Sequence, residues 1–137
     1  MGRVVSVAFL DEGATVVVTD QFPDELVALR RAAGANESRL EGHSVDVMNE
    51  QAVGQMIATI IAKHGRLDAM TNAVGGYAAG KKLWEADPKT LDRMLTLNLR
   101  SGYVLSRAAV PAMLKQGRGA IVNVASTAAF NHAAASA

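Results

Sequence analysis

The feature that most limits the fold is the alternation of short β-branched runs with longer segments of helical periodicity. Residues 15–20 read Thr-Val-Val-Val-Thr-Asp, a run that is apolar on both faces and is therefore typical of a buried parallel strand. Residues 53–61 carry apolar side chains at i, i+3, i+4, i+7 and i+8, which predicts an amphipathic helix. Strands that alternate with such helices form right-handed βαβ units. We therefore predict an α/β fold, a doubly wound parallel sheet with helices on both faces.

Proline and glycine mark the ends of several of these elements. Pro23 begins a helix that Gly34 closes, and Gly65 closes the helix that contains the stripe at 53–61. No repeat or linker interrupts the pattern, so we expect a single domain over residues 1–137. In chain order, we expect a helix over 2–12, a strand over 15–20, a helix over 23–33, a strand over 39–47, a helix ending at 64, a strand over 67–72, a helix over 87–116 and a buried strand over 120–125.

Composition excludes several classes of function. The 14 basic and 13 acidic residues leave a net charge of +1, which gives no broad positive field for nucleic acid. No apolar run reaches the roughly 18 residues that a membrane span needs. The absence of cysteine excludes a disulfide scaffold, a thiolate zinc site and a cysteine nucleophile. The histidines lack metal-ligand spacing, so we expect no metal. These features favour a cytoplasmic protein without nucleic-acid or membrane partners.

The candidate functional residues follow the predicted strands. In open parallel sheets, ligands bind outside the carboxyl ends of the strands. The polar or glycine-containing positions at those ends are Asp20, Asp46 with Val47, Asn72 to Gly75, and Ser126. The alternative is that they only cap the helices that follow.

Asp20 has the spacing of a ribose-binding acid. It lies 18 residues after Gly2, and dinucleotide-binding motifs place an acid about 20 residues beyond their glycines. Its carboxylate would accept hydrogen bonds from the ribose hydroxyls and repel the additional phosphate of NADP. The sequence therefore favours NAD over NADP, with capping of the helix at Pro23 as the alternative.

Asn98 interrupts the apolar stripe of the long helix, which Leu91, Met94, Leu95, Gly102 and Leu105 define. A buried amide without a partner costs about 1–3 kcal/mol. We therefore expect a helix kink, a water molecule or a catalytic network to satisfy it. The residues alone favour a structural role.

Ser126 invites comparison with serine hydrolases. The sequence around it, Val-Ala-Ser-Thr-Ala, lacks the Gly-x-Ser-x-Gly elbow of that class. His132 has no orienting acid nearby in the sequence, which disfavours a catalytic triad.

Three segments in this order resemble the classical short-chain dehydrogenase/reductase family. They are Leu-Asp-Ala-Met-Thr-Asn-Ala-Val-Gly at 67–75, Leu-Thr-Leu-Asn-Leu at 95–99 and Gly-Ala-Ile-Val-Asn-Val-Ala-Ser at 119–126. The resemblance implies a Rossmann-like domain that transfers a hydride between a nicotinamide cofactor and a carbonyl or secondary alcohol. Bacterial 3-oxoacyl-carrier-protein reductases and sugar or alcohol dehydrogenases are the nearest subgroups.

The resemblance also assigns roles to individual residues. It makes Ser126 the catalytic serine that binds the substrate oxygen, and Asn98 the asparagine that holds a helix kink and a water of the proton relay. It implies that Asp46 and Val47 contact adenine, and that the loop from Asn72 through Ala73 to Gly75 lies beside the cofactor ribose. It implies a homo-oligomer, dimer or tetramer, in which the long helix packs against its symmetry mate.

The sequence departs from the family pattern in three places. The family begins with a strand and a glycine-rich loop, of which only Gly2 corresponds to a residue here, and the second asparagine of its Asn-Asn-Ala-Gly segment is Ala73. A Tyr-x-x-x-Lys pair is expected a little more than a dozen residues after Ser126, and the chain has 11 residues there. We therefore expect an incomplete domain that is inactive by itself. The alternative is a non-catalytic binding or interaction module of the same fold.

Overall fold

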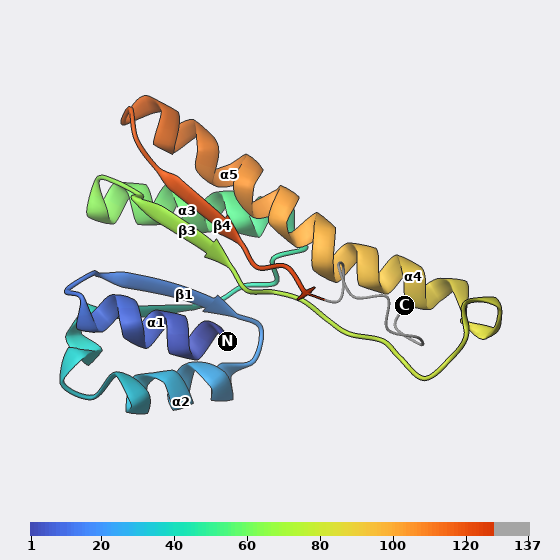
Figure 1. Ribbon diagram of the computed structural model, residues 1–137. Coiled ribbons are helices and arrows are strands. Elements are labelled where there is room, and N and C mark those ends of the chain that lie inside the picture. The colour runs from blue at the N-terminus through green and yellow to red at the C-terminus, as the bar shows by residue number, and fades with distance from the viewer. Residues whose placement is uncertain (128–137) are drawn as a thin grey trace. The chain divides into compact units, whose positions relative to one another are not determined.

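The computed structural model describes residues 1–127 and divides the chain into two compact units, Met1–Lys63 and His64–Ala137 (Figure 1). The strands described form two separate parallel pairs, β1 with β2 in the first unit and β3 with β4 in the second. Parallel strands joined through helices are the expected α/β architecture.

The first unit alternates helices and strands closely as predicted. Its elements are α1 (Gly2–Asp11), β1 (Val16–Asp20), α2 (Pro23–Ala33), a 3-10 helix (Gly34–Arg39), β2 (Leu40–Ser44) and α3 (Glu50–His64), whose last residue lies in the second unit. Gly34 and Gly65 follow α2 and α3 with φ of 53° and 74°, a left-handed backbone that favours glycine. The predicted ends of both helices are confirmed.

Parallel pairing places the carboxyl ends of β1 and β2 side by side, with Val16 opposite Leu40 and Asp20 opposite Ser44. The core of the unit consists of Leu10, Leu29, Ala33 and Leu40, with Val7, Val16 and Val18 packed against it.

The expected strand over 39–47 is too long by three residues at its carboxyl end. The Asp46 carboxylate Oδ1 accepts a hydrogen bond from the Met48 N–H at 2.9 Å. Such a side-chain bond to the backbone two residues on turns the chain. Val47 therefore lies beyond β2, although its side chain is buried.

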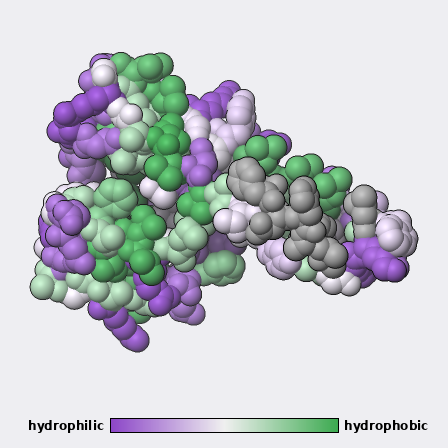
Figure 2. All heavy atoms as spheres, in the orientation of Figure 1, coloured by the Kyte–Doolittle hydropathy of each residue, from purple (hydrophilic) through white to green (hydrophobic). Residues whose placement is uncertain are grey.

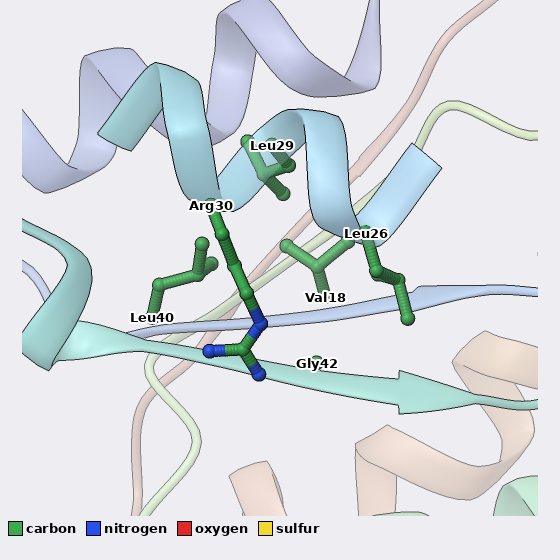
Figure 3. A pocket seen from close by; sticks show the side chains of 6 residues that line it. All are labelled: Val18, Leu26, Leu29, Arg30, Leu40 and Gly42. Carbon is green, nitrogen blue, oxygen red and sulfur yellow. The ribbon is translucent and has the colours of Figure 1, made fainter. Parts of the chain in front are cut away.

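A hollow lies between α2 and the strands of this unit. Figure 3 shows its lining: Leu26, Leu29 and Arg30 extend from α2 toward the strands, which contribute Val18, Leu40 and Gly42. A Cβ at Gly42 would lie 3.4 Å from Leu26 Cδ2, so helix and strand are in contact. The hollow has essentially no enclosed volume that could hold even a water molecule, so we assign no ligand site to it.

The second unit contains the predicted long helix, with a wider turn in its middle. Its elements are β3 (Ala69–Asn72), a 3-10 helix (Leu83–Glu85), α4 (Pro88–Leu95), a π-helical segment (Thr96–Arg100), α5 (Ser101–Lys115) and β4 (Ala120–Asn123). Asp87 caps α4, since its Oδ1 accepts from the Lys89 N–H at 2.9 Å. The strands pair in register from Ala69 opposite Ala120 to Asn72 opposite Asn123.

A side-chain amide fixes the start of β3. Gln116 Oε1 accepts from the Leu67 N–H at 3.2 Å, and its Nε2 donates to the Leu67 carbonyl at 2.6 Å and to the Arg118 carbonyl at 2.7 Å. The residue that follows α5 thus holds the segments that enter β3 and β4.

Two predictions of burial are wrong, because the side chains concerned lie at the surface. Figure 2 shows such apolar surface beside polar surface. The last strand was expected to be buried, but Val122 is 54% exposed. In the stripe of the long helix, Met94 and Leu105 are buried, whereas Leu91 and Leu95 are exposed. Within residues 1–127, no helix is both long and apolar enough to cross a membrane.

Candidate functional site

The strand-end residues of the first unit lie at one edge of its sheet. Asp20 ends β1, and Asp46 follows β2 by two residues. Because the register pairs Asp20 with Ser44, both carboxylates belong to the carboxyl edge of this pair. Asp46 is exposed and Asp20 is partly exposed, so this edge offers oxygen acceptors to a polar ligand.

Asp20 also takes part in the turn that leads into α2. Its Oδ1 accepts from the Phe22 N–H at 2.8 Å, and Phe22 is the N-cap residue of α2. The predicted alternative, a local role at the start of this helix, is therefore present in the structure. This hydrogen bond uses only Oδ1 of the Asp20 carboxylate, so a ribose-binding role of Asp20 is still open.

Gly2 is the first residue of α1 and is exposed. A Cβ at this position would meet nothing within 4 Å. The described contacts therefore give no steric reason for a glycine, and its assignment to a phosphate-binding loop stays a prediction.

Asn72 is the centre of a buried polar network in the second unit. Its side chain is 3% exposed, and its Oδ1 accepts from the Val74 N–H at 3.1 Å. Its Nδ2 donates to Ser101 Oγ at 3.2 Å and, at a longer 3.4 Å, to Asn123 Oδ1. The backbone contributes too, because the Val124 N–H donates to the Asn72 carbonyl at 3.0 Å. One amide thus joins β3, β4 and α5, which lie together in Figure 1.

Gly102 allows α5 to come this close. A Cβ at residue 102 would lie 2.8 Å from Asn123 Oδ1 and 3.2 Å from Asn72 Nδ2. Both distances are shorter than ordinary contacts, so any side chain here would push the helix away from the strand ends.

Asn98 is exposed, so the expectation of a buried amide in the apolar stripe is wrong. The amide is satisfied by the loop after β3: Oδ1 accepts from the Gly76 N–H at 2.8 Å, and Nδ2 donates to the Gly76 carbonyl at 3.0 Å. Asn98 lies at the centre of the π-helical segment Thr96–Arg100. A helix irregularity is therefore present at the position where the family resemblance implies a kink.

The glycines of this loop are required for the contact with the helix. A Cβ at Gly75 would lie 3.0 Å from Asn98 Oδ1, and one at Gly76 would lie 2.8 Å from Leu97 Cδ1. The Asn98 amide, together with these glycines, fixes the path of the chain directly after β3.

Ser126 lies three residues beyond β4 and is exposed. The neighbouring Val124 is bonded to Asn72, so the network anchors the segment that carries Ser126. Ala73 is exposed next to Asn72. His132, considered as the base of a hydrolase, lies outside the described residues.

The structure thus brings Asn72, Gly75 and Asn98 together and anchors the chain leading to Ser126. Asp20, Asp46 and Val47 form a second group in the other unit. The sequence analysis missed Ser101 and Gly76, and it gave Asn123 and Gly102 no site role. Their common signal is a polar or glycine residue on an otherwise apolar helix face or strand end.

Comparisons with known proteins agree on one family. The family model described as short chain dehydrogenase matches residues 1–137. The 3-oxoacyl-[acyl-carrier-protein] reductase of Thermotoga maritima is 26% identical over 126 residues, which are 92% of this chain and 51% of the relative. The chain spans about half the length of the curated relatives it matches.

Solved structures show the same fold. A protein from Burkholderia xenovorans, described as a short-chain dehydrogenase/reductase, superposes with a TM-score of 0.92 at 31% identity, covering 98% of this chain and 51% of that one. A metagenomic short-chain oxidoreductase in complex with NADP gives a TM-score of 0.87 at 32% identity, covering 97% and 60%. The α/β prediction is confirmed as a partial Rossmann fold.

Proposed function

The chain belongs to the short-chain dehydrogenase family, and we propose that it forms the nucleotide-binding part of an oxidoreductase that uses a nicotinamide cofactor. The proposed substrate is a small molecule with a carbonyl or a secondary alcohol group, such as a 3-oxoacyl thioester, a sugar or a simple alcohol. The observation that carries the proposal is the attachment of the glycine loop after β3 to Asn98 in the π-helical segment. This attachment places a close-packed backbone at a strand end, where ligands bind in this fold.

The residues at the strand ends suit a dinucleotide. The carboxylate of Asp20 can accept hydrogen bonds from the adenosine ribose. Asp46 and Val47 follow the neighbouring strand β2 and would contact adenine. Asn72, Ala73 and Gly75 would line the other ribose. The nicotinamide, when bound, supplies or accepts the hydride.

Ser126 and Asn98 carry the proposed catalytic side. The hydroxyl of Ser126 would donate a hydrogen bond to the substrate oxygen and so orient the reacting carbon. Asn98 would hold the helix and a water molecule of the proton relay. Its side chain is already bonded to Gly76, so the backbone of the π-helical segment is the part that remains for that water.

We further propose that NAD is preferred over NADP. A negative carboxylate at Asp20 would lie near the position of the additional phosphate of NADP, and like charges at a contact cost several kcal/mol. The metagenomic short-chain oxidoreductase was solved in complex with NADP, so the NAD preference proposed for this chain depends on its own residue at the end of β1, Asp20.

Replacing Asp20 with asparagine should shift the preference toward NADP by about tenfold or more, because it removes the like-charge repulsion. The amide oxygen of asparagine can still accept from the Phe22 N–H, so the turn before α2 should be retained. Calorimetric titration of the gene product with NAD and NADP measures the ratio of the two affinities. Glu37→Gln is the control, since Glu37 is a surface acid paired with Arg30. An unchanged ratio in Asp20→Asn contradicts the role of Asp20.

The long helix is a suitable surface for self-association, and we propose a homo-oligomer. Leu91, Leu95, Leu99 and Tyr103 follow one another at four-residue spacing and are all exposed, which is a stripe on one helix face. Farther along the same helix, Val110 is 36% exposed, whereas Met113 is buried at 7%. A cytoplasmic location fits the absence of cysteine.

A further inference from the structure

A fully buried hydroxyl lies where the long helix widens. Ser101 is 0% exposed and begins α5 directly after the π-helical segment Thr96–Arg100. Such wide turns are rare in helices and are frequently found at functional sites. The contacts of Ser101 show what holds this one open.

Ser101 exchanges a backbone hydrogen bond for a side-chain bond. In a regular α-helix its N–H would donate to the carbonyl of Leu97, four residues earlier. Here the Ser101 N–H donates to the Thr96 carbonyl. The hydroxyl of Ser101 donates to the Leu97 carbonyl instead, at 2.7 Å. The side chain has therefore taken over the acceptor that the backbone of the same residue has left.

The same hydroxyl is bonded to the strand end. Its oxygen accepts from Asn72 Nδ2 at 3.2 Å, and Asn72 Oδ1 in turn accepts from the Val74 N–H at 3.1 Å. Ser101 thus uses its one proton on the helix and its oxygen on the amide that ends β3. Since both side chains are almost fully enclosed, water cannot readily replace either bond.

We propose that Ser101 is a positioning residue that keeps the π-helical segment open and so directs Asn98 to Gly76. Without the hydroxyl, the helix gains by returning the backbone N–H of residue 101 to the Leu97 carbonyl. That change would rotate the preceding residues by about 100°, the share of one residue in a 3.6-residue turn. The Asn98 amide would then leave Gly76. The hydrogen bonds of Ser101 and Asn98 are observed in the structure. The relevance of this positioning to hydride transfer rests on the proposed function.

Amide hydrogen exchange by NMR tests this in the chain itself. In Ser101→Ala, the Gly76 amide should exchange about tenfold faster, since it loses its hydrogen bond to Asn98 Oδ1. The amides of β1 and β2, in the other unit, should exchange as before. A purely structural loss would instead accelerate the amides of β3, β4 and the Gly76 loop together.

Two variants serve as controls. Ser6 makes the same type of bond, since its Oγ donates to the Gly2 carbonyl at 2.9 Å, and its side chain is buried. Ser6→Ala should leave the exchange of Gly76 unchanged. Ser101→Thr keeps a hydroxyl, and it should restore most of the protection that Ser101→Ala loses.

The proposal is overturned if the exchange rate of the Gly76 amide is unchanged in Ser101→Ala. It is also overturned if the Gly76 amide is accelerated by the same factor as the amides of β3 and β4. If Ser101→Ala does not fold, an NMR measurement on the unmodified chain tests the proposal. There, the hydroxyl proton of Ser101 should give a slowly exchanging NMR signal with a cross-relaxation peak to Leu97. Fast exchange of this proton with water contradicts the proposal. None of these measurements uses a cofactor, so they stand apart from the test of the oxidoreductase activity.

Discussion

Asn72→Leu is expected to lower the free energy of unfolding by at least about 3 kcal/mol, because each buried polar group left without a partner costs about 1–3 kcal/mol. Leucine has a similar size but cannot accept from Val74 or donate to Ser101. The bond to Asn123 is lost as well. Urea unfolding followed by circular dichroism measures the change.

Asn49→Leu is the matched control for this substitution. Asn49 is exposed and caps α3, where its Oδ1 accepts from the Ala52 N–H at 3.0 Å. Loss of such a cap costs about 1 kcal/mol. Equal losses in the two variants would show that the Asn72 network is not an important source of stability.

Gly102→Ala and Gly54→Ala are expected to change stability in opposite directions. Both glycines lie in helices, where alanine is favoured by about 1 kcal/mol. A Cβ at Gly54 meets nothing within 4 Å, whereas one at Gly102 would lie 2.8 Å from Asn123 Oδ1. Overpacking of this kind costs about 1–3 kcal/mol. Gly54→Ala should therefore stabilise the chain, and Gly102→Ala should destabilise it.

The same two variants separate local from general effects. Gly102→Ala should also speed the amide exchange of Val74, since the displaced helix disturbs Asn72. Gly54→Ala should leave that amide unchanged. A stabilising Gly102→Ala would mean that α5 lies farther from the ends of β3 and β4 than the network requires.

Local signals in the sequence were sufficient to predict where several of the helices begin or end. Pro23, Gly34 and Gly65 act on the backbone of their immediate neighbours, and the helices they delimit begin or end where predicted. The strand over 39–47 was overestimated because the turn at Asp46 depends on one side-chain bond.

Contacts between distant residues could not be read from the sequence. Asn98 and Gly76 are 22 residues apart, Ser101 and Asn72 are 29 apart, and Gln116 and Leu67 are 49 apart. Periodicity placed Asn98 on the apolar side of its helix, but it assumed a regular 3.6-residue turn. The π-helical segment breaks that period, so Asn98 is exposed and bonded to a loop.

Burial of the last strand shows a second limit. The run over 120–125 is as apolar as a fully covered strand, but its exposure depends on which elements lie next to it. In the structure described, β4 pairs with β3 alone, and Val122 is 54% exposed. The sequence pattern indicates that a strand favours burial, whereas the elements packed beside it determine whether it is buried.

Transfer of deuterium from labelled NADH to a carbonyl substrate tests the central claim most directly. The purified product of the complete gene that encodes this chain, rather than residues 1–137 by themselves, is mixed with NADH that carries deuterium at the transferable position and with 3-oxoacyl, sugar or simple ketone substrates. We predict deuterium on the carbinol carbon of the alcohol product. Ser126→Ala should lower the rate by about a hundredfold, as loss of one donor to a reacting oxygen does, and leave nucleotide binding intact. Binding of NAD without transfer to any carbonyl, or from any alcohol, would contradict the account and indicate a binding module instead.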